Sequence, residues 1–200
     1  PAVCRPDQKE YQTFMFSAII LLMKIKEKIN ILPDGTIPTV EMTSLGFEEY
    51  FSPYKVNEAG IACVLMGGCY VTEKDFFTRP ITNIKHGAII GYKYFEFGND
   101  YSSKTMKFFA KAIGSGGKAR IRILLDDYEN GEEIGVCDID THDGVYSATV
   151  KSVTGRHAVF FVIEHRYGGW FVDSFAEKPL FELVSFSFAT ASRISISTKR

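Results

Sequence analysis

The chain has 200 residues, 46% of them hydrophobic and 14% aromatic, which suits one domain of ordinary size or one domain with an appendage. Its formal net charge is −1 at pH 7, so no positive surplus draws the molecule to nucleic acid or to an anionic membrane. Many aromatic side chains without a basic surplus fit stacking on sugars better than binding to phosphate.

The four cysteines are too few for a disulfide framework, and no Cys-x-x-Cys pair indicates a zinc site. Cys4 is isolated in a polar stretch. Cys63, Cys69 and Cys137 lie in or beside apolar runs, where we expect buried free thiols. Free thiols favour a reducing compartment or an anaerobic host, and the sequence leaves open a bacterial extracellular or a cytoplasmic location.

The first 32 residues have no single pattern. The apolar run 14–23 is too short for a bilayer span of about twenty residues, and lysines follow it, so we expect a buried or partner-covered segment and no membrane anchor. Residues 17–29 fit a helix capped by Ser17, but the Lys-Ile alternation over 24–31 fits a strand equally well. A Pro-Asp-Gly turn at 33–35 predicts a hairpin over 29–43. Residues 1–46 form the predicted appendage, and 46–53 a connector.

From residue 54 onward, short β-runs alternate with glycine- or charge-marked turns. The predicted strands are 55–59, 61–65, 69–72, 81–84, 88–97, 104–113, 118–125, 132–139, 145–151, 157–164 and 180–188. Strands of this length and spacing predict an all-β, two-sheet antiparallel β-sandwich over residues 53–188, followed by a tail at 189–200. Strict alternation in strand 88–97 places Tyr92 and Tyr94 on one face, with Phe95 and Phe97 on the other.

The densest carboxylates are Asp126, Asp127, Glu132 and Glu133. Paired acids can hydrolyse glycosides across a cleft, but these four bracket a hairpin turn, where solvated acids are common. A calcium loop suits them somewhat better, although their spacing matches no EF-hand. The four histidines share no metal-site spacing, and no serine or cysteine has a nucleophile motif. The sequence therefore predicts no catalytic residue.

The glycine-rich segment 167–171 holds Trp170, the only tryptophan. A loop indole is a natural platform for a sugar face, and an indole that closes one end of the sandwich is an equally good interpretation. Tyr101, Tyr128 and Tyr146 are further candidate rings.

Four segments, in order, resemble a family 6 carbohydrate-binding module of the kind appended to family 43 glycoside hydrolases. They are the Pro-Tyr strand at 53–60, the turn and strand at 84–92, the Thr-Gly-Arg-His strand at 154–162 and the closing Phe-rich strand at 181–188. Residues 34–43 are similar to the hairpin that ends the family 43 propeller. The resemblance implies a galactose-binding-like jelly roll, binding to polysaccharide or oligosaccharide, and a glycoside hydrolase domain as partner.

The resemblance also implies specific sites. The family's structural calcium lies near a Glu-Ala-Glu strand and a closing aspartate; this chain keeps Glu58, while Gly60 and Val184 replace the other acids. In the family's glycan cleft, Asn83 takes the position of a tyrosine and Glu182 that of an asparagine. The tryptophan expected shortly before Tyr146 is replaced by residues 142–145.

Two hypotheses follow from the resemblance. In the first, a non-catalytic module of a plant-polysaccharide-degrading enzyme binds xylan- or arabinan-type glycan weakly. Trp170, Tyr146 or Tyr167 would then supply the rings, and Glu182 and Asn83 the polar contacts. In the second, a degenerate module packs on a glycoside hydrolase domain and stabilises it without binding sugar.

Overall fold

The computed structural model describes residues 49–75, 78–99, 103–114, 117–167 and 177–190, and the backbone of two short strands, β1 (Met42–Thr43) and β2 (Gly46–Phe47). The chain divides into two compact units, Pro1–Glu41 and Met42–Arg200. All described residues belong to the second unit. The predicted helix or strand at 17–29 and most of the hairpin at 29–43 therefore lie outside the described residues. β1 pairs antiparallel with β2, so the first two residues of the predicted connector, Gly46 and Phe47, are in a strand.

From β6 onward the elements of the larger fold agree closely with the predicted strands, whereas a 3-10 helix occupies residues 59–61, where the sequence predicted the end of one strand and the start of the next. In chain order they are β3 (Asn57–Glu58), the 3-10 helix η1 (Ala59–Ile61), β4 (Val64–Met66), β5 (Tyr70–Val71), β6 (Ile81–Ile84), β7 (Ile89–Glu96), β8 (Thr105–Gly114), β9 (Ala119–Leu125), β10 (Glu132–Ile139), β11 (Gly144–Lys151), β12 (Arg156–His165) and β13 (Phe181–Thr190). β13 includes two residues that the sequence assigned to the tail.

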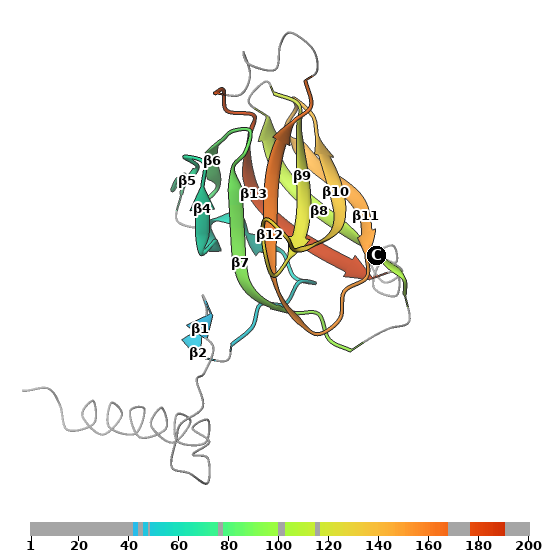
Figure 1. Ribbon diagram of the computed structural model, residues 1–200. Helices are drawn as coiled ribbons and strands as arrows, with labels where there is room; N and C mark the ends of the chain where they lie inside the picture. The colour runs from blue at the N-terminus through green and yellow to red at the C-terminus, as the bar shows by residue number, and fades with distance from the viewer. Residues whose placement is uncertain are drawn as a thin grey trace, which may run out of the picture. The chain divides into compact units, whose positions relative to one another are not determined.

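Two antiparallel sheets form a sandwich, which confirms the predicted fold class. One sheet has the strand order β10-β9-β12-β7-β4, and we call it the β12 sheet. The other has the order β11-β8-β13-β6-β5, with β3 also paired to β13, and we call it the β13 sheet. Figure 1 shows β12 and β9 in front of β13 and β8. Among the described residues, no helix is long and apolar enough to cross a membrane.

Aromatic rings from both sheets meet in the core. Phe186 of the β13 sheet lies 4.6 Å from Tyr92 and 5.0 Å from Phe161 of the β12 sheet, between ring centroids. Phe108 and Phe188 are 5.1 Å apart. All five rings are at most 2% exposed. Such tilted and edge-to-face contacts add to the large apolar area that aromatic residues bury, so this cluster is the centre of the hydrophobic core.

The predicted faces of β7 are wrong at one point. Tyr92 and Phe95 are both fully buried, although strict alternation places them on opposite faces. The register with β12 shifts here, since His157 pairs with Phe95 and Val159 with Tyr92. This β-bulge leaves one extra residue in β7 and turns both rings into the core.

The three described cysteines divide into two classes. Cys69 and Cys137 are buried free thiols, as expected. The prediction is wrong for Cys63, which is exposed. Cys63 directly precedes β4, the edge strand of the β12 sheet, where no further strand covers it.

Candidate functional site

A hollow opens on the β13 sheet around β5, β6 and the start of β13, with β5 and β6 at the left of Figure 1. Its volume is about 350 Å³. Its walls are formed by two aromatic residues, a proline, two hydroxyl groups, an amide, an ammonium and a carboxylate: Tyr70, Phe181, Pro179, Thr72, Thr82, Asn83, Lys74 and Glu182. An aromatic surface combined with a few placed polar groups is typical of small-ligand sites.

Asn83 shapes one wall because its backbone departs from the extended form of β6. Its φ is 55°, in the left-handed region that asparagine adopts more readily than most residues. Its Nδ2 donates a 2.8 Å hydrogen bond to the carbonyl of Gly68. The bond orients the amide and ties β6 to the β4–β5 turn. Such backbone conformations cluster at functional sites, which makes Asn83 a candidate on geometry as well as on sequence.

An ion pair crosses the hollow from one wall to another. Lys74 Nζ lies 2.5 Å from Glu182 Oε2, which joins the β5–β6 connection to the start of β13. The side chains are 39% and 27% exposed, so solvent screens the pair and its net contribution to stability is about 0–1 kcal/mol. The pair presents a donor and an acceptor side by side, and a sugar hydroxyl can use both.

Tyr70 is the exposed ring of the hollow. It is 56% exposed, whereas Phe181 is fully buried. Nearby, the hydroxyls of Thr72 and Thr82 lie 2.7 Å apart and share a hydrogen bond. An accessible ring next to hydroxyl, amide and charged groups offers what a pyranose needs: a surface for its C–H groups and partners for its hydroxyls.

The structure brings together two of the sequence-predicted site residues, Asn83 and Glu182, in this hollow. Tyr146 lies on β11, at the opposite edge of the sheet from β5, and its hydroxyl contacts the carbonyls of Asp140 and His142. It therefore fixes the β10–β11 turn. Tyr167 follows β12, and its hydroxyl accepts a 2.9 Å hydrogen bond from the Lys118 N–H.

Trp170 lies outside the described residues, as does Tyr101. The role of Trp170 stays a prediction. Tyr128, a lesser candidate, packs its ring 5.9 Å from that of Phe160 on the outer face of the β12 sheet.

Sequence reasoning missed Tyr70 and Lys74 as site residues. The alternation in the predicted strand 69–72 carried a signal, because Cys69 faces the core and Tyr70 therefore points outward. Nothing local identifies Lys74, since its partner Glu182 is 108 residues away in the chain.

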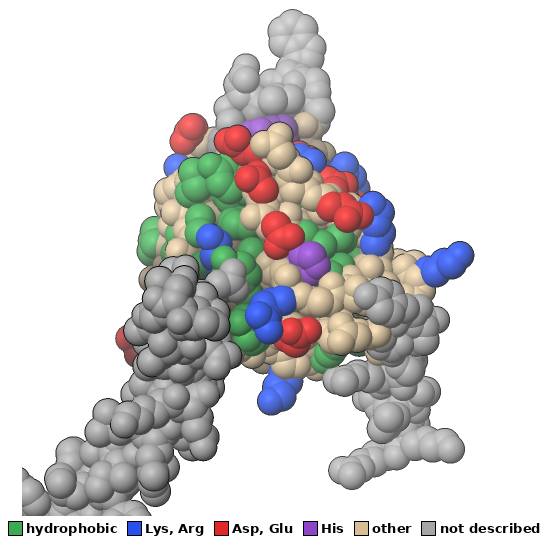
Figure 2. Space-filling view, turned by 60° about the horizontal axis from the view of Figure 1, so that its bottom comes forward, with side chains coloured by type: hydrophobic (Ala, Val, Ile, Leu, Met, Phe, Trp, Pro, Cys, Tyr) green, Lys and Arg blue, Asp and Glu red, His purple; other side chains and the backbone are tan. Residues whose placement is uncertain are grey.

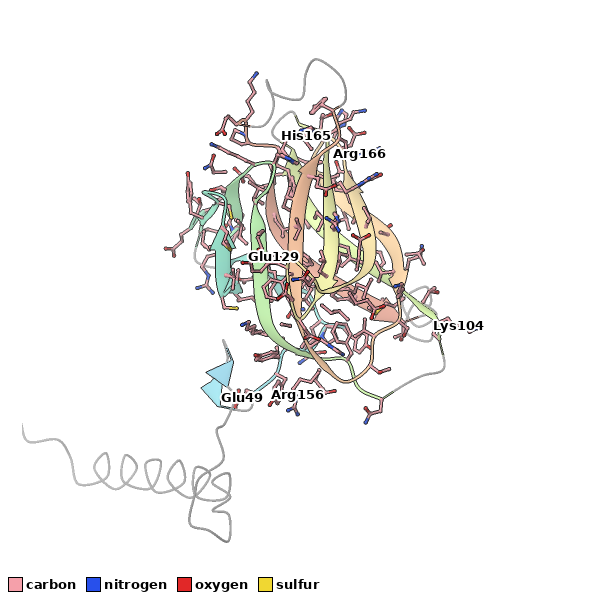
Figure 3. The ribbon with its side chains drawn as sticks, in the orientation of Figure 1. Glu49, Lys104, Glu129, Arg156, His165 and Arg166 are labelled. Atoms are coloured by element: carbon pink, nitrogen blue, oxygen red, sulfur yellow. The ribbon has the colours of Figure 1, made fainter. Side chains whose placement is uncertain are left out.

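The carboxylates at 126–133 form hydrogen bonds and ion pairs within the sandwich. Asp127 Oδ1 accepts hydrogen bonds from the N–H groups of Glu129 and Asn130 and closes the β9–β10 turn; these bonds lower the pKa of Asp127. Glu133 pairs with Arg122, and the bond raises the pKa of this guanidinium. Figure 3 labels Glu129, whose N–H is one of the two donors to Asp127. On the face shown in Figure 2, acidic and basic side chains of the described part lie interspersed.

Glu58, the predicted calcium ligand, lies on β3 and does not line the hollow. Within the described ranges, no group of three His, Cys, Asp or Glu side chains converges as a metal site. Its carboxylate forms an ion pair with Arg79, whose Nη2 is 3.5 Å from Oε2.

No protein-family model and no curated protein matches the chain. Solved structures do. A family 6 carbohydrate-binding module from Clostridium cellulolyticum, solved with xylose, matches at a TM-score of 0.57 and 23% identity, over 70% of this chain and 100% of that one. A β-1,3-glucan-binding family 6 module from Bacillus halodurans matches at 0.54 and 19%, over 71% and 100%. The sandwich has the fold of family 6 carbohydrate-binding modules.

A larger enzyme also matches. The family 43 arabinoxylan arabinofuranohydrolase from Bacillus subtilis, solved with cellotetraose, aligns at a TM-score of 0.56 and 20% identity. The match covers 82% of this chain and 33% of the enzyme. At these identities the similarity establishes the fold, and binding must be argued from the residues of this chain.

Proposed function

We propose that the chain is a non-catalytic carbohydrate-binding module that binds a glycan at the hollow on the β13 sheet. The observation that carries the proposal is the grouping of one exposed ring, Tyr70, with Asn83 and the Lys74–Glu182 pair. The similarity in fold supports it, because two solved modules of this fold were captured with sugars, one with xylose and one with cellobiose.

Tyr70 offers one exposed ring in a chain that lacks two rings of the family cleft, the tyrosine at position 83 and the tryptophan before Tyr146. Asn83 occupies the place of a stacking residue, but Tyr70 stands on the same rim and is exposed. One ring is worth about 1–3 kcal/mol of binding, by analogy with base stacking. Because the described part of the hollow has one exposed ring, we expect weak binding. The expected ligand is a xylan- or arabinan-type glycan, and the module would serve a glycosidase that degrades plant polysaccharide.

The polar groups of the hollow carry no net charge that would attract a charged ligand. Lys74 and Glu182 neutralise each other, so the hollow favours a neutral sugar over a charged one. We therefore expect binding that varies little with salt concentration. A steep loss of binding at high salt would contradict a neutral ligand.

Affinity electrophoresis tests the proposal, in gels that contain xylan, arabinan, cellulose or no polysaccharide. We expect one polysaccharide to retard the protein, and we expect Tyr70→Ala to weaken retention about 5- to 150-fold. Val145→Ala is the matched control, because Val145 is 65% exposed on β11, away from the hollow. Melting temperatures verify that each variant is folded.

Trp170→Ala separates the two candidate platforms. If that variant loses retention while Tyr70→Ala keeps it, the binding site lies at the indole and the hollow is rejected. If no gel retards the wild type, the binding proposal fails. The alternative, a module that packs on a glycoside hydrolase domain and stabilises it, then gains support from the match to the arabinofuranohydrolase.

A further inference from the structure

The Glu58 carboxylate is in an unusual position at the junction of β3 and η1. Its side chain is 41% exposed as a whole, yet the atom Oε2 is shielded from solvent and accepts no hydrogen bond from the described residues. The Arg79 guanidinium lies 3.5 Å from that oxygen. A shielded anionic oxygen needs a compensating positive charge, and here a side chain of the same domain supplies it.

The absence of a side chain at Gly60 allows Arg79 to lie beside Glu58. A Cβ at position 60 would lie 2.5 Å from the backbone oxygen of Arg79 and 2.8 Å from its Cβ. An acidic side chain at position 60 would therefore collide with backbone. The glycine lets the end of the β5–β6 connection pack directly on η1.

These residues do not fit the calcium that the family resemblance implies. Calcium takes 6–8 oxygen ligands, usually with several carboxylates. Here Glu58 is the one carboxylate of the three family positions, since Gly60 and Val184 occupy the other two. The Arg79 cation beside Oε2 would also repel a divalent ion.

We propose that Arg79 takes the place of the structural calcium that the family resemblance implies, and that the domain folds independently of calcium. The ion pair holds the β5–β6 connection against β3. The same connection is closed by the Thr72 N–H to Pro80 carbonyl bond and carries Lys74 at the rim of the hollow. Two ion pairs, Arg79–Glu58 and Lys74–Glu182, thus anchor it at both ends.

Thermal melting of the full chain in calcium and in EDTA tests the proposal without any variant. We expect the same melting temperature in both. A rise with calcium that Glu58→Gln abolishes would overturn the proposal, because it would show that the carboxylate binds the metal.

Charge variants test the role of Arg79. Arg79→Met leaves the shielded oxygen uncompensated, and we expect its melting temperature to fall by about 2–4 °C. Removing the anion as well, in Arg79→Met with Glu58→Gln, should restore part of the loss. Lys55→Met is the matched control, since Lys55 is an exposed cation three residues before Glu58. Additive losses in the double variant, or an equal loss in the control, would reject the pairing.

Discussion

The imidazole of His157 lies against the carboxylate of Asp126, with Nδ1 2.7 Å from Oδ2. The other ring nitrogen is 3.0 Å from the Thr154 carbonyl, and Asp126 Oδ1 accepts a bond from the Ala158 N–H. Asp126 has a φ of 64° and directly follows β9, so these contacts fix the β9–β10 turn to the start of β12. The Thr-Gly-Arg-His segment of the sequence therefore has a structural role.

Asp126→Ala removes both hydrogen bonds and leaves an alanine at positive φ. We expect the free energy of unfolding to fall by about 1–3 kcal/mol, measured by urea denaturation. Asp126→Asn should lose less, because asparagine tolerates this backbone conformation and keeps an acceptor. Glu129→Ala, in the same turn, is the control; an equal loss there would show that the Asp126 contacts are unimportant.

Gly114 ends β8 at a close approach to the β10–β11 turn. A Cβ there would lie 2.1 Å from the Thr141 carbonyl oxygen. We expect Gly114→Ala to cost about 1–3 kcal/mol of unfolding free energy, since backbone must move. Gly144→Ala provides the comparison: its Cβ would meet nothing nearer than 4.0 Å, and its stability should stay near wild type. Equal stabilities would contradict this close packing.

The thiols should differ in reactivity. Burial raises the pKa of Cys137 to about 12 and also raises that of Cys69. Cys63 is exposed. We expect iodoacetamide at mildly alkaline pH to alkylate Cys63 in the folded protein, and Cys69 and Cys137 only after denaturation. Peptide mass mapping reads this out, and early labelling of Cys137 would show that the β10–β9 edge opens.

The contribution of Asp127 to stability should be present at neutral pH and lost in acid. The N–H groups of Asn130 and Glu129 lower the pKa of Asp127 in the folded state. Its contribution is therefore present above the unfolded-state pKa of about 3.9 and is lost as the pH falls through the lower folded-state value. Asp127→Asn should melt below wild type at neutral pH, with a gap that closes under acid conditions. A gap that widens in acid would contradict the sign.

The sequence predicted the strands well because local signals determine them. β6 and β10 have the predicted bounds, and the strands from β7 to β13 end within two residues of the expected positions. Glycine-marked turns and alternating apolar residues depend on the nearby chain alone. In β8, for example, every second residue from 106 to 112 is buried: Met106, Phe108, Ala110 and Ala112.

What the sequence missed depends on distant contacts. The bulge between Tyr92 and Phe95 arises from the pairing with β12, which no local pattern encodes. The hollow unites residues 70–83 with 179–182, and Asn83 and Glu182 were identified only because the family resemblance aligned them. Lys74 and Arg79 had no motif to mark them, since their roles come from partners in β13 and β3.

The central position of β13 has a consequence for how the domain is made. β13 lies between β8 and β6, and Ile84 and Gly114 both pair with Phe181. During synthesis, β6 and β8 emerge long before the strand that joins them, and each presents an unpaired edge until residues 181–190 leave the ribosome. Assembly is therefore late and of high contact order, and a nascent chain halted before residue 181 is exposed to aggregation.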